Sequence, residues 1–205
     1  HELGEPIDNL LLEDVQRPEP GAGEVLLDVS AVGLAFPDVL QCRGQYQFKP
    51  PLPFTPGGET AGTVVAVGEG VDGFEPGQAV VGMGGGLAEQ VAVSADRLFA
   101  VPGSLSAAKA AAIPLNYCTT WYALHERAQL AEGETLLVTG AAGGTGSAAI
   151  QLGLAAGATV IAVAGGPEKA AACAELGAHF VIDHREVGDL VERVRELTDG
   201  KGVDV

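Results

Sequence analysis

The sequence predicts an α/β protein in which a small N-terminal β-barrel domain is followed by a partial Rossmann domain, a doubly wound parallel sheet. Three observations support this prediction. Residues 1–103 contain short apolar runs separated by Gly and Pro, residues 135–205 alternate apolar runs with helical patterns, and a glycine-rich turn joins one apolar run to a helix. We place the domain boundary between residues 103 and 104, where the composition changes to alanine-rich, so the second domain covers residues 104–205.

The first domain is expected to be an irregular barrel of short strands. Its apolar or alternating runs are bounded by Pro-Gly pairs, which form turns. One helix is expected over residues 36–43, with Asp38 near its positively polarised start. The strands are expected over residues 25–32, 60–67, 78–81 and 89–93, with a turn at residues 94–96.

The second domain alternates helical and strand patterns, which is typical of a parallel sheet. Its first helix is predicted over residues 104–112 with Ser106 as N-cap, and a longer helix over residues 116–130. Pro167 stands in the first turn of a later helix, where proline is tolerated. Further helices are predicted at 145–156, 167–176 and 187–197, and strands at 135–139, 159–164 and 180–182, with the start of a fourth at 203–205.

The turn after the first of these strands has the glycine pattern of a dinucleotide site. In residues 140–146, Ala141 stands where the usual fingerprint has its first glycine. Gly143 lets the backbone approach a pyrophosphate, and Gly146 lets the helix pack closely on the strand. The helix that starts here offers unpaired N–H groups and the positive end of its dipole to phosphate. The residues predicted to bind the cofactor here are Ala141, Gly143, Gly144, Thr145 and Gly146.

Charge and composition exclude several classes of function. The chain has 205 residues and a net charge of −16, which argues against a nucleic-acid partner and against an anionic membrane surface. Its three cysteines form no C-x-x-C pair, which indicates a reducing compartment and no disulfide framework. No apolar stretch has the character of a membrane span. We therefore expect a cytoplasmic protein that binds neither nucleic acid nor membrane.

The two ends of the sequence predict that the chain is an internal fragment. It begins without Met, residues 1–4 resemble the exit from a strand, and residues 203–205 resemble the first part of one. On this interpretation the C-terminal part of the Rossmann domain is absent, and the fragment itself can lack activity.

Several segments along the whole chain together resemble one enzyme family. They are residues 32–38, 43–46, 53–62, 140–146, 168–169, 176–178 and 181–185. The chain resembles the medium-chain dehydrogenase/reductase superfamily and, within it, the zinc-independent, zeta-crystallin-like quinone oxidoreductases. The resemblance implies a GroES-like N-terminal domain, a Rossmann domain, and an active site in the cleft between the two.

The resemblance also predicts that no metal takes part. Where zinc-dependent members of the superfamily have a Cys and a His ligand, this sequence has Ala35 and Gly58, whose side chains offer no donor atom. The four closely spaced cysteines of the structural zinc site are missing as well. The histidines show no ligand spacing; they are His1, His125, His179 and His184.

The end of the second Rossmann strand predicts NADPH rather than NADH. An NAD-preferring site has a carboxylate there to bind the ribose hydroxyls, whereas residues 164–166 read Ala-Gly-Gly. Gly165 thus leaves room for a 2′-phosphate, and Lys169 could neutralise it; the alternative is that Lys169 is a solvated helix lysine. His184 and Arg185, at the end of the third strand, are expected at the same adenosine end.

The family resemblance suggests residues for the reaction itself. A quinone or an α,β-unsaturated carbonyl is already electrophilic, so hydride transfer needs alignment more than acid–base help. Tyr46 matches a tyrosine at the family's substrate cleft, where it would orient a carbonyl or protonate the product; the alternative is a packed loop aromatic. Thr120 matches a threonine near the nicotinamide, the alternative being a helix Thr bonded to backbone. Asn116 is a weaker candidate for a residue that binds the cofactor.

Other residues are expected to support structure. Asp38 and Glu59 are interpreted as carboxylates that brace a helix start and a turn, and Cys118 as a buried small residue. Arg43 is assigned no role. Many family members have Asn at the position of Ala35, so the specificity for quinones is left open.

The sequence therefore predicts an NADPH-dependent, zinc-free oxidoreductase that transfers hydride to a quinone or an α,β-unsaturated carbonyl. An enoyl-thioester reductase of the same superfamily is an alternative, although the charge of −16 does not favour the basic entrance that a carrier-bound substrate needs. A non-catalytic NADPH-binding protein is another, since lens crystallins of this family are structural. The resemblance implies a homodimer in the full-length protein.

Overall fold

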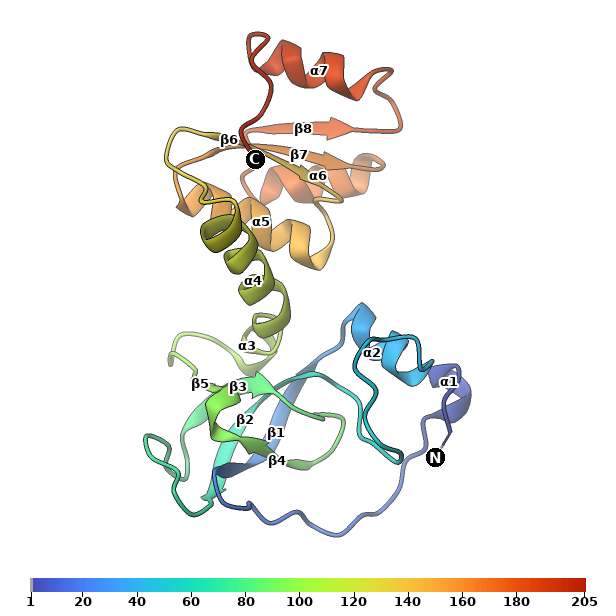
Figure 1. The fold of residues 1–205 in the computed structure, drawn as a ribbon, viewed down its shortest axis with the longest axis vertical. Coiled ribbons are helices and arrows are strands. Elements are labelled where there is room, and N and C mark those ends of the chain that lie inside the picture. The colour runs from blue at the N-terminus through green and yellow to red at the C-terminus, as the bar shows by residue number, and fades with distance from the viewer. Residues whose placement is uncertain (1) are drawn as a thin grey trace. The chain divides into compact units, whose positions relative to one another are not determined.

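The computed structural model describes residues 2–205, which form two compact units that meet in sequence between Pro114 and Leu115. Each unit has a sheet and a core of its own (Figure 1). The alanine-rich segment after residue 103 packs with the first unit, because Ala110 and Ala111 are buried in one cluster with Ala61 and Val81. Across residues 2–205, no helix is long and apolar enough to cross a bilayer.

The first unit contains a five-stranded antiparallel sheet with the strand order β4-β1-β2-β3-β5 (Figure 1). The four strands predicted from the sequence are confirmed, and the short β5 is one that the alternation pattern did not predict. Inward-facing side chains such as Val25, Leu27 and Val64 form its core. The strands are β1 (Glu24–Gly33), β2 (Glu59–Val67), β3 (Ala79–Met83), β4 (Gln90–Ser94) and β5 (Leu98–Ala100).

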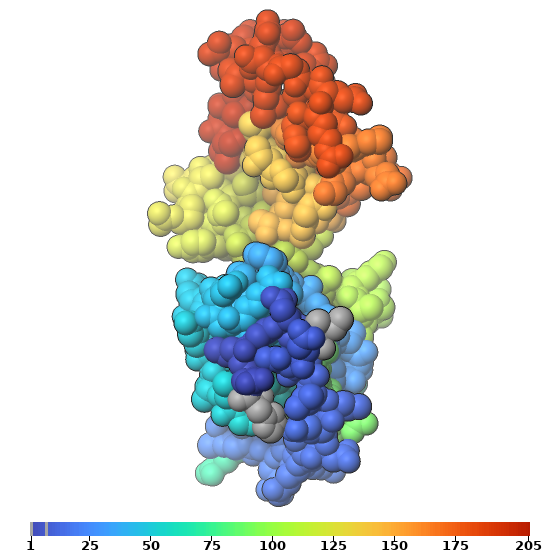
Figure 2. All heavy atoms as spheres, turned by 90° about the vertical axis from the view of Figure 1, so that its right-hand side faces the viewer, coloured from blue at the N-terminus to red at the C-terminus, as the bar shows by residue number. Residues whose placement is uncertain are grey.

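The first unit also contains short helices. The predicted helix that contains Asp38 is confirmed as α2, and the predicted N-cap Ser106 accepts a hydrogen bond from the backbone N of Lys109 at 3.4 Å. Figure 2 shows the N-terminal residues, in dark blue, lying against the segment that includes α2. The helices are α1 (Pro6–Asn9), α2 (Phe36–Cys42), η1 (Ala95–Arg97) and α3 (Ala107–Ala110).

The second unit has a parallel sheet with the order β6-β7-β8 and helices on both faces, as the sequence predicts (Figure 1). Alternate residues of β7 reach opposite cores: Val160 packs with Ile150 of α5, and Ile161 packs with Val194 of α7. This is the doubly wound arrangement. Its elements are α4 (Pro114–Trp121), η2 (Tyr122–Arg127), β6 (Thr135–Thr139), α5 (Gly144–Ala155), β7 (Thr159–Ala164), α6 (Pro167–Glu175), β8 (Phe180–Asp183) and α7 (Leu190–Leu197).

Some boundaries differ from the predicted ones for local reasons. The helix predicted over residues 116–130 changes to a π-helical turn after Trp121. The last helix starts at Leu190 because the Asp189 carboxylate caps it, accepting from the next turn's backbone. Residues 203–205, where the sequence predicts the start of a fourth strand, form no strand, although they are hydrogen-bonded to β6: the N of Leu137 donates to the O of Val205 at 2.8 Å.

Candidate functional site

The glycine turn between β6 and α5 presents open backbone to solvent. Gly143 is the N-cap residue of α5, and no side chain caps the helix there. Gly143, Gly144 and Thr145 are all exposed. The first-turn N–H groups of α5 therefore face water together with the positive end of the helix dipole, which is the arrangement that binds phosphate.

Two glycines of the turn differ in what surrounds them. A Cβ built on Gly146 would lie 2.5 Å from the O of Gly140 and 2.6 Å from the Cα of Ala141, so only glycine lets α5 lie this close to the turn. A Cβ built on Gly143 would meet only the O of Gly140, at 3.3 Å, and is otherwise open. Ala141 is fully buried and its N donates to the O of Val163 at 3.0 Å. Its methyl group points into the core, so alanine is compatible with the turn here.

Helix α4 brings Asn116 and Thr120 to this turn. The hydroxyl of Thr120 donates to the backbone O of Thr145 at 3.2 Å, and Thr120 is only 2% exposed. The hydroxyl of Thr145 donates to Oδ1 of Asn116 at 3.5 Å. The Asn116 amide lies over Gly144, where an added Cβ would approach it to 2.6 Å. These contacts favour a positioning role for Thr120, since its donor is used to hold α5.

The ends of β7 and β8 bring together the residues predicted for the adenosine end. A Cβ built on Gly165 would lie 2.6 Å from Nε2 of His184 and 3.2 Å from Nε of Arg185, so both side chains lie directly over this glycine. His184 and Arg185 are exposed. Lys169, in the first turn of α6, is exposed too, and it has no ion-pair partner among residues 2–205.

Asp183 is a functional candidate that the sequence analysis left without a role. Both carboxylate oxygens accept from the N of Gly166 at 3.0 Å, and Oδ1 also accepts from the N of Arg185 at 2.9 Å. These backbone donors, Gly166 foremost, hold the pKa of Asp183 below its ordinary value, and the nearby charges of Arg185 and His184 act in the same direction. Its signal in the sequence was an acidic residue directly after a short strand.

In the first unit, one carboxylate braces Ala35 and Gly58, the two positions that the family resemblance matches to zinc ligands. Oδ2 of Asp38 accepts from the N of Ala35 at 2.7 Å, and Oδ1 accepts from the N of Gly58 at 2.8 Å and the N of Gly57 at 3.2 Å. The predicted structural role of Asp38 is therefore confirmed. Glu59 is buried at the start of β2, paired with Gly33 of β1.

No metal site is built by the described side chains. Within residues 2–205, no three His, Cys, Asp or Glu residues are grouped closely enough to hold an ion. His1 lies outside the described residues.

Replacing Asp38 with alanine should lower the free energy of unfolding by about 2–4 kcal/mol, because three buried or partly buried backbone donors would lose a charged acceptor. Chemical denaturation of the isolated protein measures this. The stability of Asp38→Asn should lie between those of the unaltered protein and Asp38→Ala, since only one of the two side-chain amide atoms, the oxygen, can accept a hydrogen bond. Asp96→Ala removes an exposed carboxylate of the same unit and should change stability by less than about 0.5 kcal/mol. Equal effects of the changes at positions 38 and 96 would contradict the brace.

Tyr46 lies in the loop after α2 and belongs to the first unit. It is half-buried, and its backbone N donates to the O of Leu40 at 3.2 Å. Among the residues that the structure describes, its hydroxyl has no hydrogen-bond partner. The backbone of Tyr46 is thus bound to α2, while its hydroxyl is available.

The expectation that Cys118 is buried is wrong: the side chain is exposed. It lies with Tyr117, Trp121 and Leu152 around a shallow apolar depression on α4 and α5. A helical pattern shows which side chains share a face, but not whether another element covers that face.

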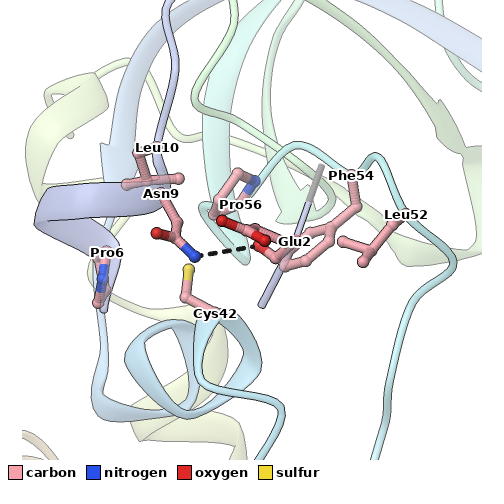
Figure 3. Close-up of a pocket in the computed structure, with 8 residues that line it drawn as sticks. All are labelled: Glu2, Pro6, Asn9, Leu10, Cys42, Leu52, Phe54 and Pro56. Atoms are coloured by element: carbon pink, nitrogen blue, oxygen red, sulfur yellow. Dashed lines mark hydrogen bonds between the residues drawn. The ribbon is translucent and has the colours of Figure 1, made fainter. Parts of the chain in front are cut away.

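A small pocket in the first unit lies between the N-terminal residues, α2 and the loop after it (Figure 3). Its volume is about 30 Å³, which is room for about one water molecule and excludes a cofactor. Burial, and to a smaller extent the charge of Asp38, raises the pKa of the Cys42 thiol, which disfavours the thiolate form. The pocket is lined by Glu2, Pro6, Asn9, Leu10, Cys42, Leu52, Phe54 and Pro56.

Two family models match successive parts of the chain. Residues 21–103 match the alcohol dehydrogenase GroES-like domain, and residues 144–205 match the zinc-binding dehydrogenase model. The first match covers the antiparallel sheet of the first unit, and the second covers α5 and the elements after it. Together they show a GroES-like domain followed by part of a Rossmann domain.

Individual proteins resemble the chain over nearly its whole length. A quinone oxidoreductase-like protein 2 homolog from Nematostella vectensis is 39% identical over 100% of this chain and 56% of its own length. The crystal structure of Escherichia coli quinone oxidoreductase complexed with NADPH superimposes with a TM-score of 0.89 at 34% identity, over 99% of this chain and 62% of that one. The crystal structure of CurK enoyl reductase superimposes with a TM-score of 0.87 at 35% identity, over 98% of this chain and 64% of that one. The chain thus spans somewhat more than half the length of these relatives.

Proposed function

The chain belongs to the medium-chain dehydrogenase/reductase superfamily, and we propose that it is the cofactor-binding part of an NADPH-dependent oxidoreductase that reduces a quinone or an α,β-unsaturated carbonyl. One observation carries the proposal: the open, uncapped turn at Gly143 and the cationic cluster over Gly165 belong to the same sheet edge of one unit. The NADPH complex of the E. coli relative supports this choice of cofactor.

The residues present fit such a cofactor. The first-turn N–H groups of α5 would bind its pyrophosphate, and Gly146 keeps the helix close enough for them to do so. His184, Arg185 and Lys169 would surround a 2′-phosphate at Gly165, while the carboxylate of Asp183 accepts from the backbone N–H groups of Gly166 and Arg185. When bound, NADPH supplies the hydride. Asn116 and Thr120 would fix the turn on the side of α4.

We propose that the reaction needs no zinc. The two ligand positions are Ala35 and Gly58, whose side chains have no donor atoms, and their backbone N–H groups are both taken by Asp38. A quinone or enone needs alignment rather than a Lewis acid to accept hydride. The proposed partners are this small-molecule acceptor and, at full natural length, a second copy of the chain.

Tyr46→Phe should lower kcat for an enone by about 100-fold, because the carbon next to the carbonyl needs a proton after hydride arrives. The reduced form of a quinone is protonated readily by water, so kcat for a quinone should fall less than kcat for an enone. The assay follows NADPH oxidation by a quinone and by an enone, with the chain at its full natural length. Tyr122→Phe removes an exposed hydroxyl and serves as the matched control. A Tyr46→Phe enzyme that behaves like this control would refute a role for the phenol.

An enoyl-thioester reductase is the second candidate, and the likeness to CurK enoyl reductase favours it. The same hydride would reach the β-carbon of a thioester-conjugated alkene. Comparing kcat/KM for a free enone and for its enoyl-thioester analogue separates the two: a thioester preference of more than about tenfold would establish the second candidate.

A further inference from the structure

Asp183 occupies the end of β8, where it joins two segments that are distant in sequence. Its carboxylate accepts from the N of Gly166, which precedes α6, and from the N of Arg185, which follows β8. It is therefore the side chain that links the loop after β7 to the loop after β8.

The loop between β7 and α6 has an unusual backbone conformation, which the hydrogen bonds of Asp183 support. Gly166 has φ of +94°, a left-handed conformation, and is buried directly before α6. The guanidinium of Arg185 lies against it: a Cβ built on Gly166 would be 3.1 Å from Nη1 of Arg185. Two contacts thus fix where Arg185 lies, the backbone bond to Asp183 and the packing on the glycine pair.

The orientation of the carboxylate distinguishes Asp183 from an acid that binds ribose hydroxyls. Both of its oxygens face the N of Gly166 at 3.0 Å, and one of them also faces the N of Arg185. The carboxylate is thereby directed at backbone N–H groups of its own loops rather than at a bound ligand.

We propose that Asp183 is a positioning residue for the 2′-phosphate: it holds the Gly165–Gly166 loop and Arg185 in the arrangement that favours NADPH over NADH. This inference rests on the proposed NADPH-binding function. It predicts a selective effect, because NADH lacks the phosphate that Arg185 would contact.

Binding of NADPH and of NADH to Asp183→Ala and Asp183→Asn tests the proposal by fluorescence titration. Asp183→Ala should raise the Kd for NADPH about tenfold and the Kd for NADH less than about threefold. Asp183→Asn should keep NADPH binding within about threefold, since its single carbonyl oxygen can still accept from both Gly166 and Arg185. This rescue separates hydrogen bonding from charge.

Amide hydrogen exchange of the unaltered protein gives a second readout that no folding failure can obscure. The N–H groups of Gly166 and Arg185 should be protected despite their place in loops, and unprotected exchange would overturn the proposal. An unchanged NADPH-to-NADH ratio in Asp183→Ala would overturn it as well. Tighter NADPH and weaker NADH binding in that variant would instead identify a ribose-binding acid. Failure of the unaltered protein to bind NADPH at all would refute the proposed function itself.

Discussion

Replacing Gly146 with alanine should abolish detectable NADPH binding and lower the free energy of unfolding by about 3 kcal/mol. The new methyl group would collide with the O of Gly140 and the Cα of Ala141, at 2.5 and 2.6 Å. Both atoms belong to the backbone of the turn, so neither can move away by changing a rotamer. Relief requires α5 to move off the turn, which displaces the N–H groups that would bind the pyrophosphate. Denaturation and nucleotide titration measure the two effects.

Gly153→Ala is a matched control in the same helix. Gly153 lies further along α5, away from the turn. A methyl group there would meet side chains of the strands rather than backbone, Cδ2 of Leu136 at 2.7 Å and Cγ2 of Val160 at 3.1 Å. We expect partial loss of stability with NADPH binding retained. Gly188→Ala, where nothing lies within 4 Å of the added atom, should change neither property. Normal NADPH binding by Gly146→Ala would contradict the role of the turn.

Removing both Lys169 and Arg185 by alanine substitution should weaken NADPH binding by about 100-fold and leave NADH binding within about threefold. The reason is that both cations would act on the 2′-phosphate, which only NADPH carries. Since the sites are exposed, the effect should shrink as salt is added. Isothermal titration with each nucleotide at two salt concentrations measures it.

The matched control removes two other exposed cations of the same unit, Arg195 and Lys201, and so changes the net charge equally. If that double variant lost NADPH affinity as strongly, the effect would belong to the overall charge of −16 and not to a site. Equal losses for NADPH and NADH in the Lys169 and Arg185 variant would likewise contradict a 2′-phosphate pocket.

Most of the fold could be predicted because it follows from patterns within single segments. Alternating or continuous apolar runs mark β1 to β4 and β6 to β8, and the glycine turn marks the start of α5. Elements shorter than a pattern were missed: β5 has three residues and α1 has four. The change from α-helix to π-helical turn after Trp121 depends on packing that periodicity does not record.

The candidate site was predictable where the chemistry depends on residue type and was missed where it depends on direction. Gly146 was identified because a helix this close to a strand tolerates no side chain. Asp183 was not, because the sequence does not show that its carboxylate reaches back to the N of Gly166, 17 positions earlier. The prediction that Cys118 is buried was wrong for a similar reason, since the exposure of a side chain depends on what covers its helix face.

The most direct test of the NADPH site is the fluorescence of Trp121, the only tryptophan of the chain. Trp121 is next to Thr120, whose hydroxyl donates to the backbone O of Thr145 in the first turn of α5. We therefore expect its fluorescence to respond to a nucleotide bound at the glycine turn. Titration with NADPH should give saturable quenching at lower concentrations than titration with NADH, and Gly146→Ala should remove the NADPH signal. Tighter binding of NADH than of NADPH, or quenching by NADPH that persists in Gly146→Ala, would contradict the proposed site.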